Sequence, residues 1–144
     1  MKFTDRLSLK KYWVKKMLKP NEIGRSGEER TQKYLLKNGY EILDTNFHSR
    51  WGEIDIVAKK GRIIAFVEVK ARAVGSIVRP VEAVNKKKIE KLIKTAWVYI
   101  QKNSIRLQPR FDICEVEYYP DTQTVKIVNY IKNAFMLEDD YAVF

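Results

Sequence analysis

The chain has 144 residues, and its 28 Lys and Arg against 18 Asp and Glu give a formal net charge of +10. This length fits one domain and excludes a second full one, while the positive balance favours a polyanionic partner such as nucleic acid over an anionic membrane surface. No stretch approaches the roughly 20 apolar residues of a membrane span, so we expect a soluble, cytoplasmic protein without stable membrane insertion.

The N-terminal arm, residues 1–20, differs from the rest of the chain in charge. It contains seven Lys and Arg against one Asp, interleaved with apolar side chains, a pattern typical of a basic amphipathic helix. Such an arm can pack on its own domain, lie on lipid or follow a phosphate backbone. We expect it to pack on the domain with its lysines outward.

A helix is predicted after this arm. Residues 20–24 resemble a linker, and the capping-box spacing of Ser26 and Glu29 predicts a helix that opens there. The helix is expected to stop at Asn38-Gly39. Because the capping box accounts for Glu29, Glu28 is the acid left on the stripe that faces the sheet. It either supplies a metal or water ligand or is favoured by the positive end of the helix dipole, and both interpretations stay open.

A strand is predicted over residues 40–47, and polar residues follow it. Asn46, His48 and Arg50 lead into Gly52. The single histidine has no His or Cys partner at metal-ligand spacing, so a zinc site is not expected. Arg50 and His48 either contact a phosphate or line an exposed turn.

Two strands then carry the chemistry. In the second, Glu68 and Lys70 are two residues apart and therefore share one face of the sheet. A tight hairpin through Gly61 would place Asp55 of the first strand near Glu68. Two carboxylates can share Mg²⁺, and a nearby lysine can orient water at a phosphodiester. The alternative is a solvated ion pair, but the apolar run 63–69 favours a buried strand that keeps charges only when they are paired or metal-bound.

Basic side chains continue beyond this strand. Arg72 is in phase with the active face, and the run through Gly75-Ser76 is either a substrate flap or an ordinary connection. A long helix is predicted to open at Pro80. Lys88 lies at the edge of its apolar stripe, so its ammonium either reaches the site or extends into water, and we expect water. The residues predicted to contact nucleic acid are Arg50, Arg72, Lys86, Lys87, Lys88 and Lys91.

A last strand pair closes the domain. Strands are predicted over residues 110–118 and 124–131 around a Pro120-Asp121 turn. Cys114 is expected to be a small core residue. The tail, residues 136–144, could pack on its own domain or on a second copy of the chain.

The order helix, three strands, helix, strands, with Asp55 before Glu68-Val69-Lys70, resembles the PD-(D/E)xK superfamily of restriction-endonuclease-like proteins. The blocks at 52–55 and 66–70 are similar to those of the YraN family of small bacterial proteins, itself similar to archaeal Holliday-junction resolvases. The remaining matching positions are Gly24, Gly27-Glu28, Tyr34-Leu35, Gly39-Tyr40, Asn46, Arg72, Lys88, Arg110-Phe111-Asp112 and Asn133-Ala134-Phe135. Thr31 departs from the family, which usually has alanine there.

The resemblance implies a three-layer α/β domain over residues 24–135, with a mixed central sheet flanked by helices in the order αβββαβ. It implies that Glu28, Asp55 and Glu68 are the acidic metal-site residues and that Lys70 is the catalytic lysine. The function expected from it is a Mg²⁺- or Mn²⁺-dependent endonuclease acting on structured or branched DNA.

Two other functions stay open. The chain could be a nucleic-acid-binding protein that does not cut, or a basic protein held at membrane surfaces by residues 1–20. Symmetric cutting of a four-way junction needs two sites on opposite strands, so a homodimer is one alternative for the oligomeric state, and the apolar end Val143-Phe144 is consistent with it.

Overall fold

The computed structural model describes residues 18–75 and 85–135. The elements run from α2 (Pro20–Lys37) through β1 (Glu41–Ser49), β2 (Gly52–Lys60) and β3 (Ile63–Ala73) to α3 (Lys86–Lys102), β4 (Gln108–Tyr119) and β5 (Thr124–Ile131). The predictions for most of the arm, for the run from Ser76 through Val84 and for the tail fall outside the described residues.

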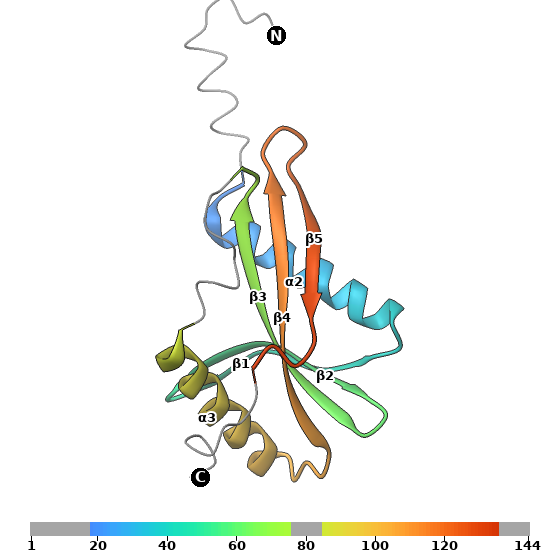
Figure 1. Cartoon of the computed structure of the whole chain (residues 1–144), viewed down its shortest axis with the longest axis vertical. Coiled ribbons are helices and arrows are strands. Elements are labelled where there is room, and N and C mark those ends of the chain that lie inside the picture. The colour runs from blue at the N-terminus through green and yellow to red at the C-terminus, as the bar shows by residue number, and fades with distance from the viewer. Residues whose placement is uncertain (1–17, 76–84, 136–144) are drawn as a thin grey trace, which may run out of the picture.

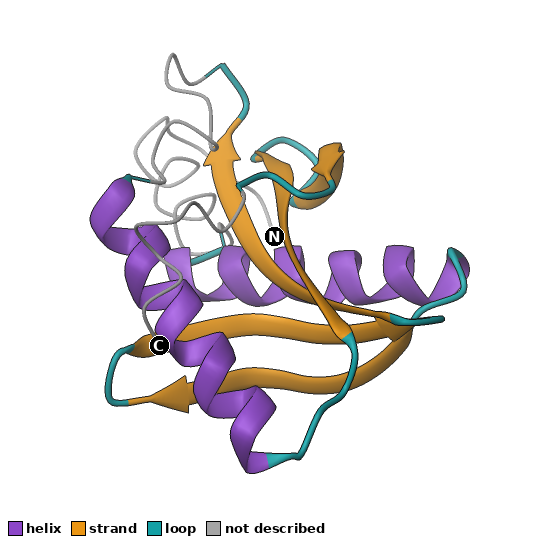
Figure 2. Ribbon diagram, turned by 60° about the horizontal axis from the view of Figure 1, so that its bottom comes forward, coloured by secondary structure: helices purple, strands orange, loops and turns teal. Residues whose placement is uncertain are grey.

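All five strands form one mixed sheet in the order β1-β2-β3-β4-β5. β3 and β4 are parallel, and the other neighbouring strands are antiparallel. The parallel pair needs a crossover, and the chain segment between these two strands contains α3. The two helices lie on opposite faces of the sheet (Figures 1 and 2). The three-layer α/β fold with a mixed central sheet is therefore confirmed.

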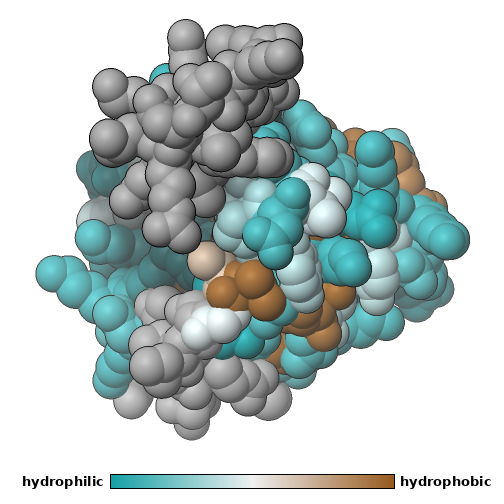
Figure 3. Space-filling view, turned by 90° about the horizontal axis from the view of Figure 1, so that it is seen from above, coloured by the Kyte–Doolittle hydropathy of each residue, from teal (hydrophilic) through white to brown (hydrophobic). Residues whose placement is uncertain are grey.

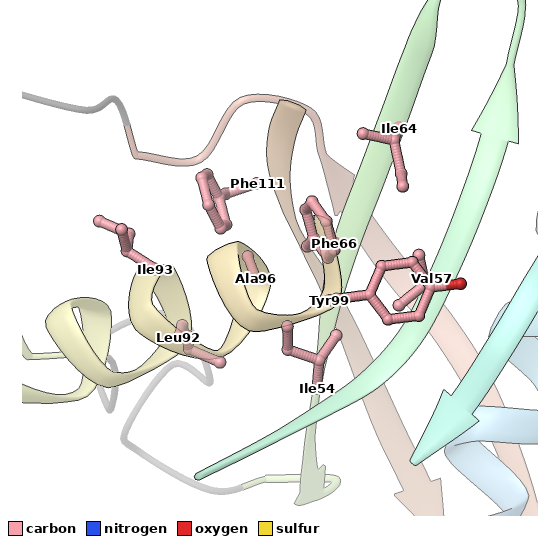
Figure 4. Packing of buried hydrophobic residues seen from close by; sticks show 9 residues of the cluster. All are labelled: Ile54, Val57, Ile64, Phe66, Leu92, Ile93, Ala96, Tyr99 and Phe111. Carbon is pink, nitrogen blue, oxygen red and sulfur yellow. The ribbon is translucent and has the colours of Figure 1, made fainter. Parts of the chain in front are cut away.

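Each face of the sheet has its own apolar core, because neighbouring side chains of a strand point to opposite faces. On one face, α3 packs Leu92, Ala96 and Tyr99 against β2, β3 and β4 (Figure 4). On the other face, Leu35 of α2 packs against strand residues such as Val67. Cys114 is fully buried in this second core, as predicted.

The start of α2 differs from the prediction. The helix begins at Pro20, so residues 20–24 are its first turns rather than a linker, and Ser26 lies inside it. Lys19 is the N-cap, and its backbone N–H donates to Glu22 Oε2 at 2.7 Å. Proline fits the first helical position because it lacks the N–H that would have no partner there. The prediction was misled by the capping-box spacing of Ser26 and Glu29, which lies inside the helix and does not cap it.

The start of α3 also differs. The described helix begins at Lys86 rather than at Pro80. Asn85 is its N-cap, and its side chain accepts a hydrogen bond from the backbone N–H of Lys88 at 2.9 Å. Asparagine is among the best N-caps because its side-chain oxygen satisfies one free N–H of the first turn.

The turns follow the prediction more closely. α2 stops where expected, with Gly39 at φ +85°. Gly61, at φ +58°, joins β2 to β3 as the predicted hairpin. β5 spans the predicted residues, and β4 is slightly longer than predicted at both ends. No helix among the described residues is long and apolar enough to cross a membrane.

Candidate active site

The centre of the site is the point where β2 and β3 separate. Their register runs from Lys60 opposite Ile63 to Ile56 opposite Val67 and then ends. At the next position, a side chain replaces the backbone as hydrogen-bond acceptor: Oδ2 of Asp55 accepts the N–H of Val69 at 2.7 Å. A carboxylate that bonds the neighbouring strand in this way satisfies a backbone donor and holds its own side chain in the opening between the strands.

The Glu68 side chain projects from β3 beside this opening and forms ion pairs with two lysines. Its Oε1 lies 3.1 Å from Nζ of Lys70 and 2.9 Å from Nζ of Lys88. The Glu68 side chain is 10% exposed. Lys70 comes from the same face of the same strand, as predicted, whereas Lys88 reaches across from the first turn of α3. The expectation that Lys88 extends into water is wrong, because burial of Glu68 beside Asp55 creates a negative site within reach of the helix.

The two carboxylates influence each other. Burial raises the pKa of Asp55 to about 8, and repulsion by Glu68 contributes to that shift, while the Val69 N–H opposes it. Buried carboxylates in close proximity accept a proton or a cation more readily than isolated ones. The hairpin prediction, which placed Asp55 near Glu68, therefore agrees with the geometry.

The two lysines are shifted in opposite directions. Burial and the neighbouring Lys88 lower the pKa of Lys70, and Glu68 offsets part of this effect. Burial by itself would lower the pKa of Lys88, but its contacts with Lys70 and Glu68 outweigh burial and raise it. Lys70 is thus the lysine that releases a proton more readily, and Lys88 is the one that remains a cation.

Glu28 approaches the site from α2. It is partly buried, and burial raises its pKa, with further contributions from Glu53 and Glu68 that a hydrogen bond with the Asn46 side chain opposes. Asn46 has φ +52°, a left-handed conformation that asparagine tolerates better than most residues. The charge of Glu28 therefore interacts with the site, and its hydrogen bond with Asn46 connects it to β1.

The fit of these acids to a metal ion can be tested on their arrangement. Across residues 18–75 and 85–135, no three His, Cys, Asp or Glu side chains come close enough together to hold a metal ion. Mg²⁺, however, is commonly bound through one or two carboxylates, with water and substrate phosphate completing the shell. Asp55 and Glu68 suit that mode, because they repel each other across the opening between β2 and β3. Glu28 interacts with Glu68 through its charge, but among the described residues it does not form a compact three-acid group with Asp55 and Glu68.

The predicted nucleic-acid contacts are placed differently from one another. Lys86, Lys87 and Lys91 are exposed on α3. Arg72 shares the face of Glu68 but binds Glu117 on β4, at 2.8 Å between Nη2 and Oε1. Its guanidinium is thus already paired with a carboxylate.

An exposed tryptophan was missed by the sequence analysis. Trp51, in the turn between β1 and β2, is 36% exposed. The Cζ atom of Arg50 and the Nζ atom of Lys94 lie 4.5 Å and 4.4 Å from the centroid of its ring. Both distances are within the range of a cation–π interaction. The Arg-Trp-Gly run just before Glu53 could have indicated this residue. The contact with Lys94 of α3 could not be predicted, because the two residues are far apart in the sequence.

His48 stands apart from the catalytic cluster. Its Nδ1 lies 3.7 Å from Oε2 of Glu53, and its side chain is 70% exposed. The side chain is thus exposed close to the β1–β2 turn, as both interpretations of His48, a phosphate contact or an exposed turn, require.

The comparisons with known proteins agree with the family resemblance. The family model described as "Uncharacterised protein family UPF0102" matches residues 27–116, which contain all four predicted catalytic residues. A UPF0102 protein of Caldanaerobacter subterraneus subsp. tengcongensis is 43% identical over 121 residues, covering 83% of this chain and 99% of that protein. A UPF0102 protein of Clostridium tetani is 44% identical over 119 residues, covering 81% and 95%. For one from Acetivibrio thermocellus the identity is 46% over 116 residues, covering 78% and 89%. The chain belongs to the UPF0102 family, which is the YraN family identified from its motifs.

Proposed function

We propose that this protein is a metal-dependent endonuclease that hydrolyses phosphodiester bonds of structured or branched DNA. The observation that carries the proposal is the convergence on Glu68 of Lys70 and Lys88, both within 3.1 Å, beside the Asp55 carboxylate. Burying two carboxylates beside two lysines carries a desolvation penalty that the ion pairs do not readily repay, so stability alone does not explain the cluster. The cluster is suited to a reaction in which a negatively charged phosphate enters this site.

Each residue has a separate role in this proposal. Asp55 and Glu68 would hold Mg²⁺ or Mn²⁺, which supplies Lewis-acid stabilisation of the charge that develops on the phosphate. Lys70, with its lowered pKa, positions the attacking water and its proton. Lys88 remains a cation near the scissile phosphate and supports charge stabilisation from the α3 side. Glu28 orders the water shell from α2.

The DNA would be held by the surface around this centre. Lys86, Lys87 and Lys91 of α3 can contact phosphates as exposed point charges. Trp51 offers a ring on which an unpaired base can stack once Arg50 or Lys94 moves from the ring face to a phosphate. An exposed stacking group beside a backbone-binding surface favours substrates with unpaired or splayed bases, which is a property of branched DNA.

The proposal is tested with a labelled panel of four-way junction, flap, duplex, single-stranded DNA and RNA, incubated with Mg²⁺ or Mn²⁺. The wild type is compared with Asp55→Ala and with Asp121→Asn, a matched loss of an exposed carboxylate in the β4–β5 turn. We expect cutting by the wild type and by Asp121→Asn, and none by Asp55→Ala. All three proteins are purified identically, so a contaminating nuclease would cut equally in all preparations.

A second candidate function is binding without cutting. Lys70 and Lys88 already compensate the Glu68 carboxylate within the protein, as they would in a site that holds its charges structurally. Binding of the panel with neither metal supporting cleavage, and with affinity unchanged in Asp55→Ala, would support the binder and overturn the endonuclease. Cutting of a four-way junction on both strands would in addition require two active sites, so we propose a homodimer for that substrate.

A further inference from the structure

A second basic surface lies on α2, away from the proposed active site. A groove of about 450 Å³ runs between this helix and the edge strand β5. Its lining consists of Arg30, Lys33, Tyr34 and Lys37 from α2 and Lys126 and Ile127 from β5. No acidic residue is among them.

The three helix cations form one stripe because their spacings are three and four residues. From Arg30 to Lys37 the helix rises by about 10 Å, at 1.5 Å per residue. The same length of duplex axis contains about three phosphates of one strand. The stripe therefore matches the charge spacing of a nucleic-acid backbone.

Among residues 18–75 and 85–135, no carboxylate compensates the charges of this stripe. Within the described part of the chain, Arg30, Lys33 and Lys37 form no ion pair with a carboxylate. Glu29 lies one turn before Lys33 on the same helix, a spacing at which ion pairs often form, yet the two are not paired. Three like charges beside one hollow repel each other until a polyanion enters it.

The groove also has a rigid aromatic wall. Tyr34 packs on Tyr130 of β5 with ring centroids 5.1 Å apart. Lys126 stands at the rim with its Nζ 5.1 Å from the centroid of Tyr119, so its charge is directed to the ring rather than to a carboxylate. The wall is thus held by packing and does not depend on the ligand.

This groove and the active site lie on different flanks of α2. Arg30 lies two positions after Glu28, which is a rotation of about 200° around the helix axis. Glu28 interacts with Asn46 of β1, whereas the stripe borders β5.

A view of the molecule from above shows a surface that is largely hydrophilic where it is coloured, with apolar side chains in limited patches (Figure 3).

We infer that the groove between α2 and β5 binds the phosphate backbone of a second nucleic-acid segment, outside the segment that occupies the active site. The choice of nucleic acid among polyanions rests on the proposed function. Two contact regions separated by α2 suit a substrate whose arms leave in different directions, and they would hold a branched DNA better than a short linear duplex.

The test is the salt dependence of DNA binding in EDTA, measured by fluorescence anisotropy on a four-way junction. The variant Arg30→Gln/Lys33→Gln/Lys37→Gln is compared with Arg62→Gln/Lys102→Gln/Arg106→Gln, which removes three exposed cations elsewhere and has the same net charge. We expect the negative slope of log K against log salt to become less steep by about 2.7 in the groove variant. The affinity advantage of the wild type then shrinks by about 40-fold between 50 and 200 mM salt. The control variant should retain most of the slope.

Equal losses in both triple variants, or no loss in the groove variant, would overturn the inference, and so would failure of the wild type to bind any nucleic acid. Displacement of the DNA by poly-glutamate as effectively as by competitor duplex would assign the groove to acidic polypeptides instead. Circular dichroism and thermal melting check that the variants are folded. Cleavage is assayed separately, so a groove effect without cutting retains this inference and rejects the nuclease, whereas cutting without a groove effect does the reverse.

Discussion

Two buried carboxylates on neighbouring strands have opposite surroundings. Asp112 of β4 lies on the α2 face, and both its oxygens are hydrogen-bonded by groups of the protein. Arg110 donates to Oδ1 at 2.9 Å and to Oδ2 at 2.7 Å, the Tyr130 hydroxyl donates to Oδ2 at 2.7 Å, and the Asn133 N–H donates to Oδ1 at 3.0 Å. Glu68 of β3 lies on the α3 face among lysines and another carboxylate.

The difference separates a structural acid from an acid available for chemistry. The bond to Asp112 raises the pKa of Arg110 above its already high value, and burial beside Asp112 raises the pKa of Tyr130. Arg110 and Tyr130 therefore keep their protons beside Asp112. At the other site, Asp55 and Lys70 have pKa values shifted toward neutrality, which is typical of groups that exchange protons or bind cations.

The largest effect is expected from Asp112→Asn. The change removes the charge of the fully buried Asp112 and leaves the partly buried guanidinium of Arg110 without its counterion, which costs up to about 3–5 kcal/mol. Urea denaturation measures the free energy of unfolding, and Asp121→Asn serves as the exposed control, with an expected change within about 0.5 kcal/mol. A loss for Asp112→Asn no greater than for the control would show that the network does not stabilise the fold.

A smaller effect of opposite sign is expected from Asp55→Asn. In the folded protein Asp55 keeps its proton up to pH about 8, whereas its ordinary value is 3.8. Folding therefore takes up a proton between these pH values, so the free energy of unfolding of the wild type falls as the pH rises through this interval. The amide can still accept the Val69 N–H but carries no charge. It should stabilise the metal-free protein at pH 8 by about 1–3 kcal/mol.

The measurement for Asp55→Asn is urea denaturation at pH 5 and pH 8 in EDTA, followed by melting with added Mg²⁺. The variant should lose the part of the pH dependence that Asp55 contributes, and Mg²⁺ should raise the melting temperature of the wild type but not of the variant. A variant less stable than the wild type at pH 8 would mean that Asp55 is a structural acid like Asp112.

The smallest effect is expected from Lys88→Gln. Because Lys88 lowers the pKa of Lys70, its removal should raise that pKa. The limb of the pH–rate profile that reports Lys70 should then move to higher pH, with the fold unchanged. The same profile recorded for Lys87→Gln, an exposed neighbour, is the control. A profile that stays in place would show that the two ammonium groups do not influence each other in solution.

The sequence predicted those parts of the site that depend on local spacing. Glu68 and Lys70 share a face because a strand has a period of two, and Gly61 permits the hairpin that brings Asp55 to them. The position of Lys88 was predicted wrongly, since its direction depends on a partner 20 residues away that attracts it from another element. The start of α2 was also wrong, because two capping arrangements competed and the earlier one, at Lys19 and Glu22, formed.

The sequence by itself determined the mixed α/β class, the family and the order of acid, acid and lysine along the strands, because periodicity and motif spacing are local properties. Only the tertiary structure decided that β2 and β3 separate at Asp55, that Lys88 binds Glu68, that Lys94 contacts Trp51 and that α2 and β5 form a basic groove. These features join residues far apart in the chain. Their formation depends on how the two cores place the helices on the sheet, which local spacing does not encode.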